Sequence, residues 1–369
     1  MRATQSPASS TLVRQEAIFA LLSMVAVVAF TAFVLADDDV SALAFARLAT
    51  AYVGVTLLIA ATALLFLTAH AVFKAGRASN WRASPLGAAR AAVVRKWRED
   101  RLFGFAWPVA VFAILMPSFN AFKQRILPDA GFVYDPQLAA IDRGLFGTDP
   151  GLWLHETIGS PATTAFLDGL YHGWFVPATL GVAVVGLCAG ARTRAQYMIA
   201  YVGVWIVLGA ALAYLLPAAG PAFYEALVDP ARAEPFVAVR DALAAGRGNG
   251  LLTSLHNQDY LLANLDRSAL VVGGGISAIP SVHNALAVLF ALVSFRLNRW
   301  CGFAMTGLAL LIWVGSVYLN WHYAIDGLLG AAGALILWYG AGAFVDRVLR
   351  PVAARPSPSD FAPDITVRA

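Results

Sequence analysis

The amino-acid sequence predicts an all-α, polytopic membrane protein: a helical bundle of about eight transmembrane helices, with interfacial helices in two long outer loops. Of its 369 residues, 59% are hydrophobic and only 13% are charged, and the mean hydropathy is +0.68. Soluble domains are far less apolar, and disordered or disulfide-rich chains are excluded by the same composition. Because one span needs about 20 apolar residues, the chain has room for roughly eight spans and their loops.

Eight apolar runs follow one another along the chain. The sixth is short, because its outer end begins in a polar motif rather than in lipid. The first could be a signal peptide, since Arg2 and Arg14 precede it, but its length and the acidic cluster Asp37–Asp39 behind it favour a retained helix. The runs are Ala17–Ala36, Leu48–Phe73, Leu102–Phe122, Phe166–Cys188, Tyr197–Leu216, Val282–Phe295, Gly302–Leu319 and Ile325–Val345.

The charged residues set the expected orientation. With the amino terminus inside, the inner segments hold 18 of the 26 lysines and arginines, whereas the outer segments hold 16 of the 22 acids. This asymmetry follows the positive-inside rule, so both termini are expected in the cytoplasm, with the chain in a plasma or inner membrane. It also explains the net charge of +4 without a nucleic-acid partner. The basic segment Lys74–Arg101 is predicted to be a topology-setting loop, with an amphipathic surface helix as the alternative.

Three parts of the chain are expected on this basis. Residues 1–101 form two amino-terminal transmembrane helices and the basic cytoplasmic loop, residues 102–345 form a six-helix core, and residues 346–369 form a disordered cytoplasmic tail. Within the core, the outer segments Lys123–Ala165 and Pro217–Ile279 are too long to be simple connectors, and loops of that length are usually functional.

The first candidate site motif lies at the outer start of the sixth run. A flexible glycine stretch, Gly273–Gly275, leads into Pro280, Ser281 and His283. Proline and serine are residues that start helices, and they leave free backbone N–H groups beside the histidine. Such a helix start attracts anions, and phosphate in particular.

The second candidate motif begins the eighth run. His322 and Asp326 stand four residues apart and therefore share one face of a helix. A carboxylate in that position can bind one ring nitrogen, which leaves the other nitrogen nucleophilic or basic. The orientation derived from Lys and Arg alone also places His283 and His322 on the same outer side. A single histidine at a span end is more often structural, but two of them with a paired aspartate favour catalysis.

These motifs resemble those of a known family. Pro280-Ser281-Val282-His283 is similar to the PSGH motif of the type 2 phosphatidic acid phosphatase superfamily, and His322-Tyr323-Ala324-Ile325-Asp326 is similar to the end of its last motif. The resemblance implies that His322 is the nucleophile that becomes phosphorylated, that Asp326 orients it, and that His283 is the general acid. It also implies that no metal and no cofactor takes part.

The departures from the family pattern point to one branch of it. The phosphate-binding Arg of the last motif is replaced by Ser316, and the family's first motif is absent after Lys123. The outer segment instead contains Asp135-Pro136 and Ile141-Asp142, and Leu216–Pro221 precedes the later outer loop. This arrangement is similar to the branch that contains fungal inositol phosphorylceramide synthase, which transfers a phospho-headgroup between lipids.

Another cation must therefore offset the charge of the phosphoryl group. Lys123 and Arg125 are the first candidates, with interface anchoring as the equally supported alternative. Loop arginines are usually solvated, so the weaker candidates are Arg143, Arg240, Arg247 and Arg267. Ser281, His172 and Tyr323 complete the predicted phosphate- and headgroup-binding set, and His172 could instead form a structural pair with Asp168, one helical turn away.

The sequence thus predicts a metal-independent lipid phosphotransferase at the outer membrane face, acting through a phosphohistidine. Its partners would be a lipid phosphate or phospholipid donor, a lipid or sugar alcohol acceptor, and the bilayer. Hydrolysis of a prenyl or glycerolipid phosphate is the alternative reaction. A transporter is disfavoured because the ionisable residues lie at span ends rather than at the midplane. A non-catalytic lipid-binding or scaffold protein that retains the fold stays open as a third class, because the phosphate-binding Arg is missing. The feature that discriminates against it is an intact triad, and all three members are present.

Overall fold

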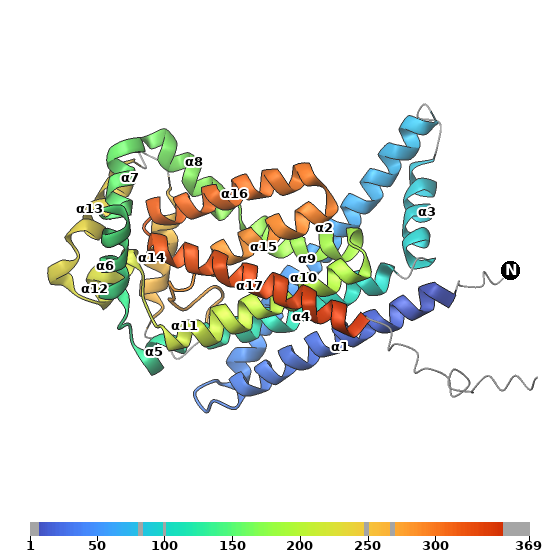
Figure 1. Ribbon diagram of the computed structural model, residues 1–369, viewed down its shortest axis with the longest axis horizontal. Coiled ribbons are helices and arrows are strands. Elements are labelled where there is room, and N and C mark those ends of the chain that lie inside the picture. The colour runs from blue at the N-terminus through green and yellow to red at the C-terminus, as the bar shows by residue number, and fades with distance from the viewer. Residues whose placement is uncertain (1–6, 80–83, 99–100, 247–250, 266–269, 350–369) are drawn as a thin grey trace, which may run out of the picture.

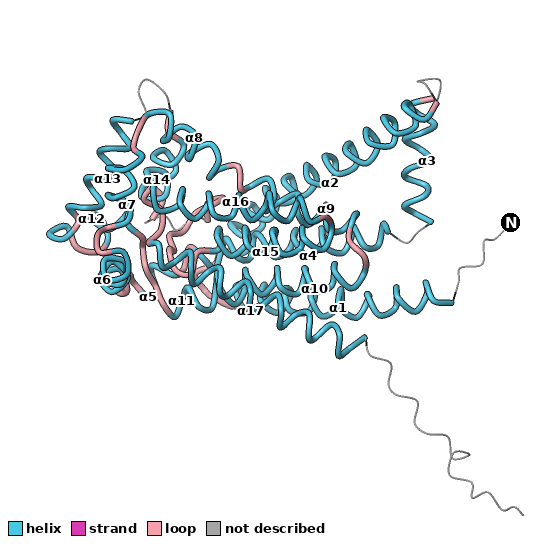
Figure 2. The backbone as a smooth tube through the Cα atoms, turned by 45° about the horizontal axis from the view of Figure 1, so that its top comes forward, coloured by secondary structure: helices cyan, strands magenta, loops and turns pink. Residues whose placement is uncertain are grey.

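The computed structural model describes residues 7–79, 84–98, 101–246, 251–265 and 270–349. Over this part of the chain it is helical and contains no strand (Figures 1 and 2). The long helices run side by side, and shorter helices gather at one end of the bundle, on the left in Figure 1. The predicted all-α membrane bundle is therefore confirmed.

Six helical segments are long and apolar enough to cross a bilayer. Each matches one of the predicted apolar runs, and the fifth run is a continuous span from Ala191 to Leu215 that includes a π-helical stretch. The helices are α1 (Pro7–Leu35), α2 (Ala42–Ala78), α4 (Arg101–Lys123), α10 (Ala191–Gly203) with η1 (Val204–Leu212) and α11 (Ala213–Leu215), α16 (Arg299–Tyr318) and α17 (Ala324–Leu349).

The other two predicted spans are shorter. The sixth run is α15 (Val282–Leu297), whose 16 residues extend for about 24 Å, less than the thickness of a bilayer core. The fourth run is interrupted, because α8 (Pro161–His172) ends at Gly173 and α9 (Phe175–Cys188) begins after Trp174. The sequence did not predict this break, because the fourth run is apolar on both sides of it. The break lies at the same end of the bundle as the start of α15.

Both long outer segments are helical, as predicted. The first contains α5, α6 and α7 and leads into α8, and the second contains α12, α13 and α14 with two short 3-10 turns. They cover one end of the bundle, which we call the histidine end because α15 and α17 start there with His283 and His322 beside them (Figure 1). Their bounds are α5 (Ile126–Ala130), α6 (Asp135–Phe146), α7 (Pro150–Ile158), η2 (Pro221–Phe223), α12 (Tyr224–Leu227), η3 (Pro230–Arg232), α13 (Glu234–Gly246) and α14 (Thr253–Ala263).

The two amino-terminal helices pack directly on the core. Helix α1 lies against α4 and α10, and α2 lies against α4 and α9. A buried ion pair fixes α1, because Nη2 of Arg194 donates to Glu16 Oε2 at 2.8 Å and the Trp107 indole donates to the same carboxylate at 2.9 Å. The basic segment after α2 contains a helix, α3 (Pro85–Arg98). At the other terminus α17 continues to Leu349, and the remainder of the expected tail lies outside the described residues.

Candidate active site

His322 and Asp326 form a buried pair at the start of α17. Nδ1 of His322 lies 3.5 Å from Oδ2 of Asp326, and the two side chains are 5% and 0% exposed. Among the described residues, neither that Nδ1 nor Oδ1 of Asp326 has a hydrogen-bond partner. A separation of 3.5 Å is longer than a formed hydrogen bond, and catalytic hydrogen bonds are often long until substrate binds. Because the carboxylate faces Nδ1, Nε2 is the ring nitrogen left for chemistry.

The turn between α16 and α17 holds this pair in place. The backbone N–H of Tyr323 donates to Asp326 Oδ2 at 3.0 Å, and the N–H groups of Trp321 and His322 both donate to the carbonyl of Ser316. Asn320 takes a positive φ of 64° to make the turn. Ser316 stands where the family pattern has its phosphate-binding Arg, and in this chain its carbonyl supports the turn that carries His322.

Helix α6 caps the start of α17 from outside. Asp142 is 2% exposed, and its carboxylate accepts hydrogen bonds from the N–H groups of Ala324 at 2.6 Å and Ile325 at 2.9 Å. These N–H groups are two of the donors at a helix start that have no partner within the helix. A negative carboxylate there also interacts favourably with the positive end of the helix dipole. Burial raises the pKa of Asp142, and the two backbone hydrogen bonds act against that rise. The cap therefore fixes the first turn of α17, which carries Asp326.

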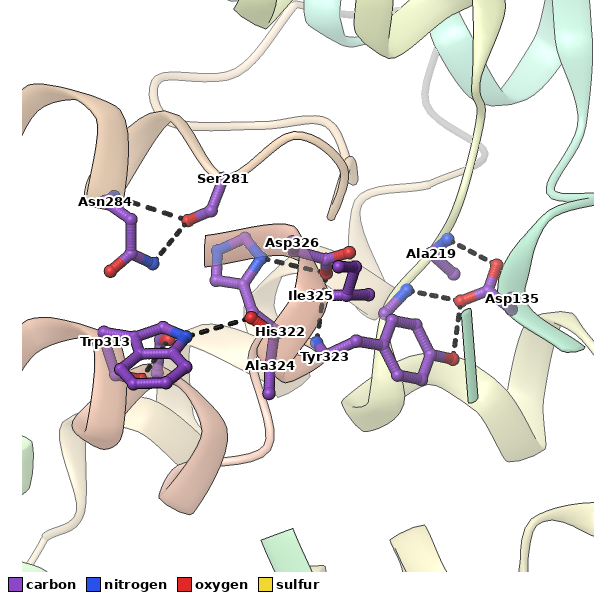
Figure 3. A network of polar contacts seen from close by, with 12 residues as sticks. Asp135, Ala219, Ser281, Asn284, Trp313, His322, Tyr323, Ala324, Ile325 and Asp326 are labelled. Carbon is purple, nitrogen blue, oxygen red and sulfur yellow. Dashed lines mark hydrogen bonds and ion pairs between the residues drawn. The ribbon is translucent and has the colours of Figure 1, made fainter. Parts of the chain in front are cut away.

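Asp135, two turns earlier on α6, makes a second set of contacts. Its carboxylate accepts from the N–H groups of Ala219 and Gly220, both at 2.8 Å, and from the Tyr323 hydroxyl at 2.9 Å (Figure 3). Burial raises the pKa of Asp135, with these hydrogen bonds opposing it. Tyr323, which the sequence placed among the phosphate-binding residues, is thus held by a carboxylate, with its side chain 2% exposed.

His283 occupies the second position of α15, two residues after Ser281, which caps the helix. The Ser281 side chain accepts from the N–H of Asn284 at 3.4 Å and from its side-chain amide at 3.0 Å, and the serine is fully buried. The N–H of Ser281 donates to the carbonyl of Asp326 at 3.1 Å, which joins the starts of α15 and α17. Ser281 therefore contributes the helix cap that its sequence position predicted.

The ring of His283 lies among aromatic rings. The centroids of Tyr171 and His283 are 5.3 Å apart in a stacked arrangement, and that of Trp174 is 4.3 Å away, edge-on. The rings of His283 and His322 are separated by 5.6 Å. The break between α8 and α9 is what brings Tyr171 and Trp174 to this histidine. The two predicted catalytic histidines are thus brought together.

Lys123 is the last residue of α4. It is half-buried, and it lies within electrostatic range of His283, as do His172 and His322. Among the residues that the structure describes, no carboxylate forms an ion pair with it. An unpaired ammonium beside two histidines has the chemistry needed to bind a phosphoryl oxygen.

The glycine stretch before α15 is clamped onto the same helix end. The Gln124 amide exchanges two hydrogen bonds with the backbone of Val271, and the Asn120 amide donates to Gly274 and accepts from Gly273. Gly275 has a φ of +84°, and a Cβ there would come within 2.7 Å of the Lys123 carbonyl oxygen. This contact fixes the end of α4 against the loop that leads into α15.

Arg125 lies apart from the histidines. It forms ion pairs with Asp37 at 2.9 Å, Asp39 at 2.8 Å and Asp129 at 3.1 Å, so its charge is already compensated. Three other arginines of the outer segments are also paired, Arg143 with Asp149, Arg232 with Asp229 and Arg240 with Asp259. Of the two cations that the sequence favoured for phosphate, Lys123 is the one within electrostatic range of His283.

His172 forms the pair with Asp168 that its spacing predicted. Nδ1 lies 3.3 Å from Asp168 Oδ1, and Nε2 lies 3.2 Å from the side-chain amide of Asn257. Asp168 also accepts hydrogen bonds from the N–H groups of Thr253 and Ser254, which begin α14. The pair therefore has a structural role in seating α14 over the site.

Sequence reasoning assigned no role to four of these positioning residues. Asp135 and Asp142 were recognised only as part of a branch-like pattern, although their spacing of seven places both on one face of a helix. The amides of Asn120 and Gln124 share a face in the same way, where a span ends. In both cases the spacing was visible in the sequence, but the backbone groups that accept or donate the hydrogen bonds come from distant segments.

The geometry can be compared with known proteins. The model of a family described as the PAP2 superfamily matches residues 136–340, which is more than half of the chain and includes all three members of the triad. No curated protein and no solved structure matches the chain. The superfamily is that of the type 2 phosphatidic acid phosphatases, whose members are generally phosphatase- or phosphotransferase-type lipid enzymes. On its sequence and the extent of this match, the chain belongs to the PAP2 superfamily.

Proposed function

We propose that the protein is a lipid phosphotransferase that works through a phosphohistidine at His322. The observation that carries this proposal is the convergence, at one end of the bundle, of the His322–Asp326 pair, His283 and the unpaired Lys123. A nucleophile with its orienting carboxylate, a second histidine for proton transfer and a cation are the groups that phosphoryl transfer requires.

The proposed reaction has two half-reactions. In the first, Nε2 of His322 attacks phosphorus, and a P–N bond forms as the P–O bond to the donor lipid breaks. His283 gives its proton to the departing oxygen. In the second, an acceptor hydroxyl gives its proton to His283 while its oxygen attacks phosphorus and displaces Nε2. The imidazolium of His322 is stabilised by Asp326, and the charge of the five-coordinate phosphoryl group by Lys123. None of these steps uses a metal.

The distribution of charge supports an extracytoplasmic site. Arginines mark the end of the bundle opposite the histidine end, at the start of α10 and α16 and near the end of α15 and α17. By the positive-inside rule that end faces the cytoplasm, so the histidines face outward and both termini lie inside.

The resemblance to the inositol phosphorylceramide synthase branch favours transfer to a lipid or sugar alcohol. Hydrolysis is the second candidate, and one observation favours it. A pocket of about 20 Å³ beside His322, lined in part by Asp142 and Asn320, is large enough for about one water molecule with polar partners.

The decisive experiment uses the purified full-length protein in detergent with a chelator present. Labelled lipid phosphates and phosphodiesters are supplied with and without alcohol acceptors, and the wild type is compared with His322→Ala and with His256→Ala, an exposed histidine on α14. Turnover and an acid-labile phosphoenzyme should be lost in His322→Ala and kept in His256→Ala.

The products then separate the two reactions. A new phosphorylated lipid that requires an acceptor would establish transfer, whereas free phosphate released without an acceptor would establish hydrolysis. Turnover by His322→Ala at the wild-type rate would refute the assignment of His322 as the nucleophile. If the chelator abolished the activity of the wild type and an added divalent metal restored it, the metal-free mechanism would be refuted.

A further inference from the structure

A second cavity lies at the histidine end, between α1, α4 and the span that contains η1. It is a groove of about 610 Å³ with largely apolar walls. The Phe122 ring lies at its centre, within 5.7 Å of the Phe30 ring, 6.3 Å of Phe33 and 6.0 Å of Tyr214. We call it the α1–α4 groove. Its volume and apolar walls suit a lipid chain, because apolar cavities of this size in a bilayer are not filled by water.

The π-helical segment η1 forms one wall of the groove. Ile206, Ala210 and Ala211 all belong to η1 and line the cavity. On its other side, Gly209 packs so closely that a Cβ would meet the Phe119 ring at 2.8 Å and Val282 at 2.9 Å. The π-helix thus fits tightly against the catalytic core while presenting small residues to the groove. Single π-turns within α-helices are frequently found at functional sites.

The rim of the α1–α4 groove is acidic. Asp37, Arg125 and Asp129 line it, and Asp39 also pairs with the arginine. Three carboxylates face one guanidinium, so the rim has an excess of negative charge. The carboxylates of Asp37 and Asp129 are each about one-third exposed, which leaves them accessible to a head group. An anionic head group would be repelled at this rim, whereas an ammonium group would be attracted.

We propose that the α1–α4 groove binds a membrane lipid with a cationic amine in its head group. The lipid chain lies along Phe122 and the small residues of η1, and the amine binds the carboxylates of Asp37 and Asp129. This site is separate from the proposed phosphate site, because Phe122 lines the groove whereas Lys123, His283 and His322 do not. The proposal concerns binding alone and does not depend on the proposed function.

The test measures bound lipid without turnover. The full-length protein is placed in nanodiscs that contain equal amounts of phosphatidylethanolamine and phosphatidylglycerol, and the lipids retained after mild detergent extraction are counted by native mass spectrometry. The wild type should retain the ethanolamine lipid about fivefold over the glycerol lipid, the scale expected for one partly exposed ionic contact. Equal retention of the two lipids would overturn the proposal.

Two changes separate the chain contact from the head-group contact. Ala211→Trp fills the groove and should abolish retention, while Ala332→Trp on the exposed face of α17 should leave it unchanged. Asp37→Asn with Asp129→Asn keeps the groove open and should remove the preference for the amine. Retention by Ala211→Trp at the level of Ala332→Trp, or an unchanged preference in the aspartate variant, would show that the lipid binds elsewhere. Monodisperse elution and an unaltered melting temperature verify folding in each variant.

Discussion

At the scale of single residues, Lys123 is the group on which the charge balance of the proposed site depends. The family's phosphate-binding Arg is absent, and Ser316 in its position supports the catalytic turn through its carbonyl. Arg125, two residues from Lys123, is held by three carboxylates. In the proposed site, the phosphate of a substrate would therefore bind one ammonium group instead of a planar guanidinium. An ammonium acts as a point charge and cannot form the bidentate contact that a guanidinium forms.

Replacing Lys123 with Met should lower kcat/KM roughly 100-fold, because it removes one stabilising contact to the transition state. Lys123→Arg should recover part of this loss, since the charge returns with a different shape. Steady-state kinetics with one labelled lipid phosphate provide the measurement, and Lys74→Met, at the opposite end of the bundle, is the control. Equal activity of Lys123→Met and the control would assign the phosphate to another cation.

At the scale of elements, α6 holds the start of α17 through backbone hydrogen bonds. Its two buried aspartates bind backbone groups of the 217–220 loop and of the first turn of α17. Two aspartates that are seven residues apart and both buried are costly unless hydrogen bonds offset their desolvation, and here each has at least two.

Asp142→Asn should therefore reduce kcat by roughly 10-fold or more with little change in KM, because the amide keeps one acceptor but loses the charge that caps α17. The rate of phosphoenzyme formation should fall in parallel, since His322 and Asp326 are no longer fixed. Asp149→Asn, near the start of α7 and paired with Arg143, is the matched control. A change confined to KM would argue for direct substrate binding by Asp142 instead.

The glycine loop before α15 makes a second prediction at this scale. Gly275→Ala should destabilise the protein more than Gly147→Ala, although both glycines have a positive φ, at 84° and 74°. The backbone strain of about 1–2 kcal/mol is common to both. Only at Gly275 would the new methyl group meet a backbone oxygen, that of Lys123. The melting temperatures of the two variants in detergent provide the comparison. An equal fall in melting temperature would mean that the backbone around Lys123 shifts to accept the new methyl group at no cost.

The candidate site could be predicted from the sequence only where its signals were local. His283, His322 and Asp326 were found because their neighbours and spacing carry the information. The break at Gly173, the π-helical wall and the partners of Asp135 were not found, because an apolar run looks alike whether it is continuous or interrupted. Hydrogen bonds between segments more than 80 residues apart leave no periodic pattern in either segment.

At the scale of the whole molecule, the prediction concerns sidedness. Glu156→Cys on α7 should react with a membrane-impermeant thiol reagent in intact cells, whereas Arg77→Cys at the far end of α2 should react only after permeabilisation. Both positions are exposed, and Cys188 and Cys301 are first replaced by alanine. Labelling measured by a mass shift checks the result. The reverse pattern would invert the orientation that the positive charges predict.

The fold also distributes the catalytic groups over segments that are far apart in the chain. Lys123 ends α4, the aspartate cap belongs to α6, and the starts of α15 and α17 are joined by the bond from Ser281 to Asp326. As the chain is synthesised, α17 is the last of the described helices to enter the bilayer, and it carries both the carboxylate that orients His322 and the backbone that seats α15. Until then His322 lacks the carboxylate of Asp326. The proposed site would therefore be complete only when the last of the described helices is in place.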